Sequence, residues 1–271
     1  MKGLFVFVLF HFCCSAVKSQ ELFLFTNPAS NVPKNTLVAR GMNSFFQRSI
    51  DKSTSYHFMP EVEFGLSKKM MIIANGFISN EHNKIRVEGA SFLTQYRFLS
   101  KDASKRHFRM AVWSRCALNN ADIHQEEIEL NGHNSGVRIG ITATQLLHKT
   151  AISSTISFQK ALNNFENKIP TTYSTQTVDF TLSLGQLVLP KTYKNFNQTN
   201  VNVMVEMLAQ THPANGETFL DIAPVLQFIF KSRARLDIAY RRQLGTRTIY
   251  RTQANGIVVN FQYAFFNLGK K

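Results

Sequence analysis

Residues 256–266 (GIVVNFQYAFF) are apolar at every second position and end on an aromatic pair. Successive side chains of a β-strand point to opposite faces, so this segment would have one apolar face and one polar face carrying Asn260 and Gln262. Such a strand fits the closing wall of a membrane β-barrel in an exported protein. It also fits a half-buried sheet in a soluble protein, and the rest of the chain decides between the two.

Residues 1–19 have the parts of a secretory signal peptide. A short basic start precedes an apolar core at residues 3–14, and small residues precede the predicted cleavage site before Gln20. The apolar core is too short to cross a bilayer as a helix. Lipidation at Cys13 or Cys14 is the alternative, but large residues precede them where that processing favours small ones.

One cysteine, Cys116, follows the predicted cleavage site, so the mature chain forms no internal disulfide. Its roughly 250 residues fit one large β domain, and no apolar run is long enough for a membrane helix. The formal net charge of +14 would suit nucleic-acid binding. Export argues against that partner, and nucleic acid is excluded.

Gly, Asn, Lys and Pro residues divide the chain into segments of about ten residues, the length of a tilted membrane strand. Most segments alternate between apolar and polar residues, and no long segment has helical periodicity. Pro60 and Pro224 lie within predicted strands and imply bulges or the loss of a ladder hydrogen bond. The twelve predicted strands are residues 36–46, 56–66, 70–79, 88–99, 107–118, 136–147, 151–162, 175–189, 200–210, 219–230, 234–244 and 256–266.

The segments between these strands alternate in length and charge. Links from even to odd strands, such as residues 67–69 and 148–150, are mostly short and basic, and residues 100–106 form a somewhat longer one. Links from odd to even strands include the longest, at residues 119–135 and 163–174, and hold most of the acids. Short periplasmic turns opposite longer outer loops are typical of bacterial barrels. The basic rim is either simply solvated or attracts anionic lipid head groups.

We therefore predict an all-β protein, an antiparallel transmembrane β-barrel of about 12 strands preceded by a signal peptide. The predicted organisation is a signal peptide at 1–19, a periplasmic N-terminal arm or small plug at 20–35, the barrel at 36–266 and a tail at 267–271. A secreted soluble β-sandwich is the alternative fold, although a sandwich has no reason to sort its loops by length.

A set of polar residues would face the lumen if the alternation is read correctly. Opposed acids and arginines there shape the electric field across a pore and select the solutes that pass. Alternatively they satisfy one another and plug a barrel too narrow to conduct. The predicted pore-lining residues are Glu61, Glu63, Arg97, Arg109, Arg115, Arg138, Glu206, Asp221, Arg235, Asp237, Arg241 and Gln262.

The densest group of histidines and acids lies in the longest predicted outer loop. His124, Glu126, Glu127, Glu129 and His133 match no zinc-binding spacing, so we interpret them as a solvated acidic loop. The chain also has no nucleophile elbow, phosphate-binding glycine loop or paired-cysteine motif. We predict no enzymatic activity, no catalytic residues, no cofactor and no metal ion.

Two stretches, residues 59–69 (MPEVEFGLSKK) and 91–99 (SFLTQYRFL), resemble Bacteroidota outer-membrane barrels classed as transporters. More distantly they resemble the family named for the MetA pathway of phenol degradation. The resemblance implies a barrel of about twelve strands that moves small, possibly hydrophobic, compounds and carries no catalytic residues. Such barrels usually end at their terminal aromatic residue, whereas residues 267–271 follow Phe266 here.

The predicted function is a porin-like channel or transporter in the outer membrane of a Gram-negative bacterium, for passive passage of small solutes. The alternative is a non-conducting structural or adhesive barrel whose outer loops bind a partner. The expected partners are outer-membrane lipid and lipopolysaccharide, the barrel assembly machinery and a small solute of unknown identity.

Overall fold

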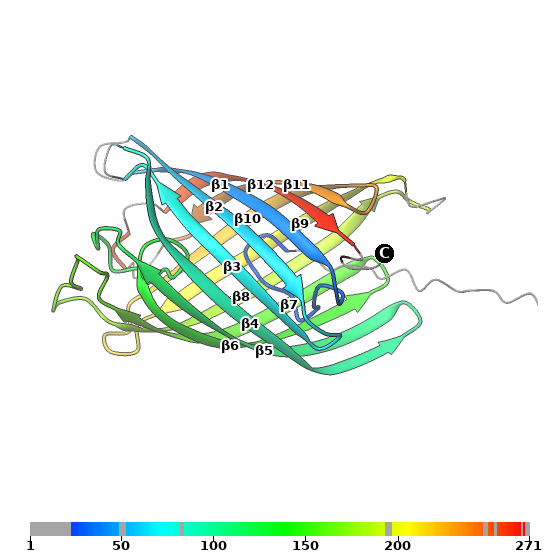
Figure 1. Cartoon of the computed structure of the whole chain (residues 1–271), viewed down its shortest axis with the longest axis horizontal. Helices are drawn as coiled ribbons and strands as arrows, with labels where there is room; N and C mark the ends of the chain where they lie inside the picture. The colour runs from blue at the N-terminus through cyan, green and yellow to red at the C-terminus, as the bar shows by residue number, and fades with distance from the viewer. Residues whose placement is uncertain are drawn as a thin grey trace, which may run out of the picture.

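The computed structural model describes residues 23–48, 53–81, 84–192, 197–245, 249–251, 254–266 and 268. The predicted signal peptide and most of the predicted tail lie outside the described residues. The strands form one closed antiparallel barrel in which β1 pairs with both β2 and β12 (Figure 1). They are β1 (Leu37–Gln47), β2 (Thr54–Gly65), β3 (Met70–Ser79), β4 (Arg86–Ala103), β5 (Arg106–Asn119), β6 (Ser135–Leu147), β7 (Thr150–Leu162), β8 (Gln176–Leu189), β9 (Thr199–Thr211), β10 (Thr218–Phe230), β11 (Ala234–Gln243) and β12 (Asn255–Phe265).

This architecture confirms the predicted barrel of 12 antiparallel strands and excludes the two-sheet sandwich. Strand bounds agree closely with the sequence pattern, except that the predicted link at residues 100–106 is wrong. The β4–β5 ladder continues to the pair Ala103 and Arg106. Polar residues suggested a loop there, but a hairpin can continue into water with polar side chains on both faces. Among the described residues, no helix is long and apolar enough to cross a membrane.

The two prolines within strands interrupt the ladder on one side only. β2 pairs with β1 through Pro60, but its pairing with β3 lapses between Phe58 and Glu61. β10 pairs with β9 through Pro224, but its pairing with β11 lapses between Ile222 and Val225. Proline has no N–H to donate, so each one faces the gap in the ladder. The predicted loss of ladder bonds is confirmed.

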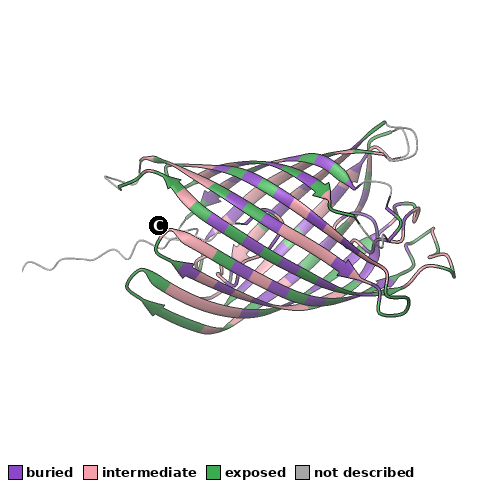
Figure 2. Cartoon of the chain, turned by 180° about the vertical axis from the view of Figure 1, so that it is seen from behind, coloured by how far each residue is buried: buried purple, intermediate pink, exposed green. Residues whose placement is uncertain are grey.

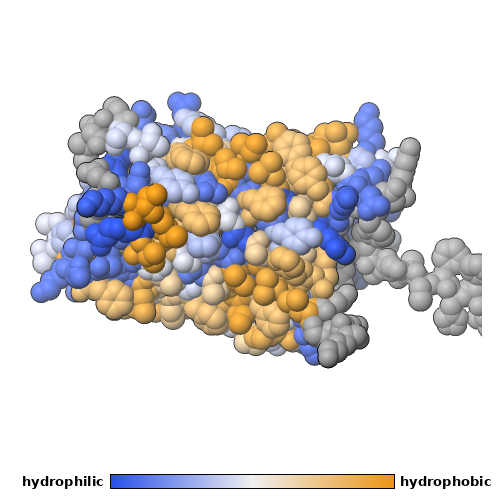
Figure 3. All heavy atoms as spheres, turned by 45° about the horizontal axis from the view of Figure 1, so that its top comes forward, coloured by the Kyte–Doolittle hydropathy of each residue, from blue (hydrophilic) through white to orange (hydrophobic). Residues whose placement is uncertain are grey.

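The outer surface of the barrel is apolar between two polar ends. Burial alternates along the strands (Figure 2), and in β8 the exposed residues include Phe180, Leu182 and Leu184. Apolar side chains cover the middle of the face shown in Figure 3, and hydrophilic ones gather at both ends. Soluble monomers rarely expose so much contiguous apolar surface, whereas a membrane-spanning barrel requires such a band. The barrel therefore spans a membrane.

The two ends of the barrel differ. The short turns and the end of β12 lie at one end, and the long loops lie at the other (Figure 1). We call residues 23–36 the arm and residues 120–134, between β5 and β6, the outer loop. The arm lies inside the barrel near the short-turn end (Figure 1). The lumen wall therefore contacts the arm near the short-turn end and the outer loop near the other end.

Candidate functional site: a chamber between two lumen segments

The arm is bound to the wall through its backbone, and Glu206 of β9 is the main acceptor. The N–H groups of Leu24, Phe25 and Thr26 donate to the Glu206 carboxylate at 2.7, 3.1 and 3.1 Å. The hydroxyl of Ser183 donates to the same carboxylate at 3.0 Å. Glu206 is fully buried, so these donors replace the water that the carboxylate loses on burial.

Wall side chains also bind the arm's other polar groups. Arg40 donates to the carbonyl oxygen of Leu24 at 2.6 Å, and Arg235 donates to that of Phe23 at 3.0 Å. Farther along, Gln95 donates to the carbonyl oxygen of Pro28 at 3.0 Å. An irregular segment can be buried only when its backbone groups find such partners. The lumen wall supplies them along the whole arm.

Apolar contacts and close packing complete the fit of the arm. Phe23 and Leu24 are buried against Met204 and Val258, and Val32 belongs to a second apolar cluster near the short-turn end. At Gly65 of β2, a Cβ atom would lie 2.1 Å from the carbonyl oxygen of Pro33. Any side chain at this position would clash with the arm, so only glycine lets the arm's backbone lie this close to the wall.

The outer loop enters the lumen from the other end and is held by ion pairs. Glu127 accepts from Arg251 at 2.6 Å and from Arg241 at 3.3 Å. Asp221 of β10 accepts from the same two arginines at 2.8 and 2.6 Å. The Arg251 guanidinium also lies 3.9 Å from the centre of the Phe219 ring, a cation–π distance. Two acids and two arginines therefore form one buried network between loop and wall.

Hydrogen bonds fix the tip of the outer loop. Gln210 of β9 accepts from the N–H of Ile128 at 3.0 Å and donates to the Ile128 carbonyl oxygen at 2.9 Å. Gln159 of β7 donates to the same carbonyl oxygen at 3.2 Å. Arg115 of β5 donates to the side-chain oxygen of Asn131. The outer loop is consequently packed into the barrel rather than extended into solvent.

A chamber with a volume of about 160 Å³ lies between the arm and the outer loop, and both segments line it. Its wall contains two ion pairs, Arg40 with Glu61 at 3.2 Å and Arg138 with Asp179 at 3.2 Å. Arg115 also lines the chamber, and it forms no ion pair with any acid in the described part of the chain. Trp113 and Met59 add apolar surface. The chamber therefore combines apolar patches with one guanidinium that interacts with Glu61 and Glu129 only beyond ion-pair distance.

The structure distributes the twelve residues predicted to line the lumen among these contacts. Glu206, Arg235 and Arg109 bind the arm, the last through Ser30 at 2.8 Å. Asp221 and Arg241 bind the outer loop network. The remaining residues are placed as follows: Glu61, Arg115 and Arg138 at the chamber, Glu63 on the same face of β2 as Glu61, Asp237 and Gln262 against Arg235, and Arg97 at the rim against the Lys68 carbonyl oxygen.

Three important residues were missed by the sequence interpretation. Arg40 shares the inner face of β1 with Val38, so the alternation of residues 36–46 contained the signal that could have found it. Glu127 and Arg251 lie in loops, where no periodicity indicates direction. The interpretation of the outer loop as solvated is wrong for Glu127 and His133, each 5% exposed. The Glu127 side chain points inward because it forms ion pairs there with the guanidinium groups of Arg241 and Arg251.

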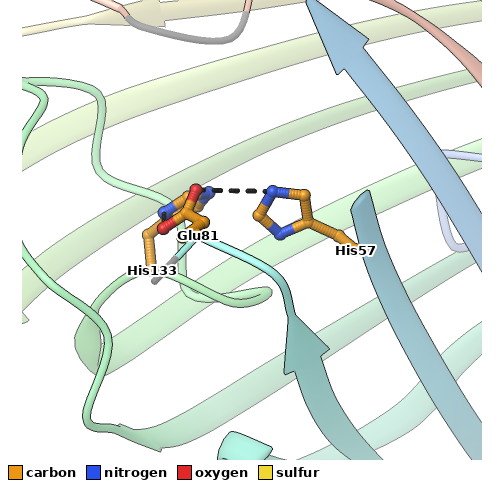
Figure 4. Close-up of side chains that lie close together, drawn as sticks. All are labelled: His57, Glu81 and His133. Atoms are coloured by element: carbon orange, nitrogen blue, oxygen red, sulfur yellow. Dashed lines mark ion pairs between the residues drawn. The ribbon is translucent and has the colours of Figure 1, made fainter. Parts of the chain in front are cut away.

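His133 belongs to a separate cluster at the long-loop end (Figure 4). Its Nδ1 lies 3.7 Å from Oε2 of Glu81, and Nε2 of His57 lies 3.4 Å from Oε1 of Glu81. Burial acts to raise the pKa of Glu81, but the imidazoles of His133, His57 and His124 outweigh it and hold that pKa well below its usual range. The Glu81 side chain is therefore a carboxylate at neutral pH.

Comparisons with known proteins place the fold. A scan against protein-family models and a search of curated proteins found no match. Among solved structures, the barrel is similar to an outer membrane channel from Pseudomonas putida F1, with a TM-score of 0.59, 8% identity, and coverage of 90% of this chain and 100% of that one. The KdgM porin has a TM-score of 0.49 at 8% identity over 85% of this chain and 99% of that one. The NanC porin has 0.49 at 10% identity over 86% and 100%.

At these identities the likeness concerns the fold alone. The chain has the fold of a membrane-spanning β-barrel of the outer-membrane channel type. Its lumen differs from an open tube because the arm and the outer loop enclose a chamber.

Proposed function

We propose that the protein is a porin-like channel of the bacterial outer membrane that passes small solutes without an energy source. The observation that carries the proposal is the polar chamber inside a barrel with an apolar outer band. Charged groups on a lumen wall select the solutes that pass. The similarity of the fold to that of an outer-membrane channel supports an outer-membrane location for this chain.

Conduction requires both the arm and the outer loop to shift, since both line the chamber. Neither is a strand of the barrel, and their attachments are side-chain hydrogen bonds, ion pairs and apolar contacts rather than ladder hydrogen bonds. Segments outside the ladder open at lower free energy than the sheet that carries them. We infer that the arm and the outer loop act as two gates in series, and that the barrel wall stays closed during opening.

The lining of the chamber favours a particular class of solute. A wholly apolar solute would displace water from Arg115 and the neighbouring ion pairs without replacing its hydrogen bonds, which is costly. A solute with a small apolar body and one anionic group would contact Trp113 and Met59 and pair with Arg115. We therefore propose small anionic or amphipathic solutes ahead of purely hydrophobic ones.

Several narrower expectations form part of this proposal. Residues 59–69 and 91–99 support a relationship to Bacteroidota transporter barrels and to the MetA-pathway family. Outer-membrane lipid, lipopolysaccharide and the barrel assembly machinery are the proposed partners, and nucleic acid is not among them. The proposal assigns the chain no enzymatic activity, in keeping with channels and porins as its structural neighbours.

The second candidate function is a non-conducting structural barrel whose outer loops bind a partner. The observation that favours it is the filled lumen, since the arm and the outer loop are both buried in the wall. In this case the buried ion pairs hold the plug in place and no solute crosses.

Liposome swelling separates the two functions. Refolded protein would be placed in liposomes in media containing small organic anions, small sugars or small organic cations. The channel proposal expects fastest entry for the anions. We would compare wild type with Glu206→Gln, which weakens the hold on the arm, and with Glu166→Gln as the matched control at an exposed loop acid. No entry of any solute in wild type or in Glu206→Gln would contradict the channel and favour the structural barrel.

A further inference from the structure

Three elements that are distant in sequence bring potential metal ligands together at the long-loop end. His57 lies on β2, Glu81 follows β3, and His133 lies near the end of the outer loop. One ligand atom from each of the three lies within 4.8 Å of the others. The carboxylate of Glu81 stands between the two imidazoles (Figure 4).

The spacing of these atoms suits a small transition-metal ion. Ligands held at about 2.0–2.1 Å from a tetrahedral Zn²⁺ are roughly 3.3 Å apart. Nε2 of His57 lies 3.4 Å from Oε1 of Glu81, and Nδ1 of His133 lies 3.7 Å from Oε2 of the same carboxylate, so each imidazole approaches that spacing from one of the two oxygens. Two histidines and one carboxylate are an established zinc ligand set. His124 Nε2 lies 3.8 Å from Oε1 of Glu81 and stands ready as a fourth ligand.

A second observation points to a ligand at this place. Nδ1 of His133 is buried and makes no hydrogen bond. Buried polar atoms almost always have partners, and a buried atom without one destabilises the fold. A metal ion bound to this nitrogen would remove that destabilisation. Next to His57 and His133, a cavity of about 40 Å³ that Glu88 and Glu129 also line leaves room for a bound water.

A neighbouring hydroxyl group competes with the ion for one ligand atom. The hydroxyl of Ser55 lies 2.8 Å from Nε2 of His57. A hydroxyl can rotate and donate elsewhere, so metal binding would exchange one neutral hydrogen bond for a coordination bond.

We propose that His57, Glu81 and His133 form a binding site for a divalent transition-metal ion of the Zn²⁺ type, with His124 as the fourth ligand. The ion would tie the outer loop to β2 and to the segment after β3. Binding itself is independent of the proposed channel. Its effect on solute passage, closure of the outer gate, rests on the proposed function.

The test uses the refolded full chain without a histidine tag, in detergent, titrated with Zn²⁺ by calorimetry. Wild type should bind one ion per chain. Loss of a supporting group in metal sites typically weakens binding 10–100-fold, so loss of a direct ligand in His57→Ala or His133→Ala should weaken it at least about 100-fold. His107→Ala is the matched control, because this histidine pairs with Asp102 in the distant β4–β5 hairpin. Heat-modifiable gel migration shows that each variant is folded.

Equal Zn²⁺ affinity in wild type and in both folded ligand variants would overturn the site, as would no binding to wild type. Protease cleavage within the outer loop gives a second readout that needs no channel. Zn²⁺ should slow this cleavage in wild type and leave the rate unchanged in His133→Ala. Equal cleavage rates in wild type with and without Zn²⁺ would contradict the proposal that the ion fixes the outer loop to β2 and to the segment after β3. Because calorimetry and proteolysis test binding without a channel, solute entry measured with Zn²⁺ tests only whether the bound ion closes the outer loop gate.

Discussion

The arm and the outer loop both fill the lumen, but the wall holds them by different means. The arm is held mainly through its backbone N–H and C=O groups, by side chains of the wall. The outer loop is held by a side chain of its own, Glu127, in a network of ion pairs, in addition to wall hydrogen bonds to the backbone of Ile128. Backbone groups are present whatever the sequence of a segment. The arm's attachment should therefore depend on the wall, whereas the loop's attachment should depend both on the wall and on one charged residue of the loop itself.

The largest expected effect comes from Glu206→Ala. It leaves three N–H groups of the arm without an acceptor, those of Leu24 and Thr26 buried and that of Phe25 partly buried, at roughly 1–3 kcal/mol for each buried group, and the arm should leave the wall. Hydrogen exchange at Leu24, Phe25 and Thr26 measures the release. Glu206→Gln retains an acceptor oxygen and should show a smaller increase in exchange. Unchanged exchange in Glu206→Ala would show that apolar packing alone holds the arm.

The next effect is that of Glu127→Ala on the outer loop. Removal of one partner from a buried ion pair costs about 3–5 kcal/mol, and Asp221 retains contact with both arginines, so we expect the lower end of that range. Protease cleavage between residues 120 and 134 should accelerate. Glu126→Ala serves as the neighbouring control: it removes one exposed hydrogen bond, from the Tyr250 N–H to the Glu126 carboxylate, and keeps the bond from its own N–H to the Tyr250 carbonyl oxygen, so cleavage should accelerate less. Equal cleavage in the two variants would contradict a special role for Glu127.

Arg115→Gln should change selectivity more than stability. Arg115 forms no ion pair among the described residues, and Glu61 keeps its ion pair with Arg40, so the loss of Arg115 leaves Glu61 paired. We expect the preference for anions over cations to fall about fivefold, equivalent to one kcal/mol. Reversal potentials in a salt gradient measure this preference. Arg106→Gln, at the start of β5 and outside the chamber, should have no effect.

The smallest expected effect comes from within the arm. Ser30→Ala removes the hydroxyl that accepts from Arg109, a change of about 1 kcal/mol. Thermal unfolding and hydrogen exchange of the arm should remain close to wild type. A shift as large as that of Glu206→Ala would contradict attachment through the backbone.

The sequence predicted the wall of the barrel well because strand alternation is a local property. β8 shows this, where Asp179, Thr181 and Ser183 fall on one face and Phe180 and Leu182 on the other. The arm and the outer loop were harder to predict from the sequence, because an irregular segment has no periodicity that distinguishes inward-facing from outward-facing residues. An arm or small plug was expected from residues 20–35, but its acceptor at Glu206 lies more than 180 residues away.

The candidate site was therefore predicted in part. The inward arginines and acids of the strands followed from alternation, but the loop residues that complete their network did not. His57, Glu81 and His133 meet only because the closed barrel brings three links to one rim. Their spacing in the sequence matches no metal-binding motif, and only the fold reveals their proximity.

Single-channel recording of the double variant Glu206→Gln, Glu127→Gln in planar bilayers tests the central claim most directly. The claim is that the arm and the outer loop are two gates in series around one chamber. It predicts brief, small openings in wild type, longer openings in each single variant and the largest open fraction in the double variant. A double variant that is folded, inserted and no more conductive than wild type would contradict the account.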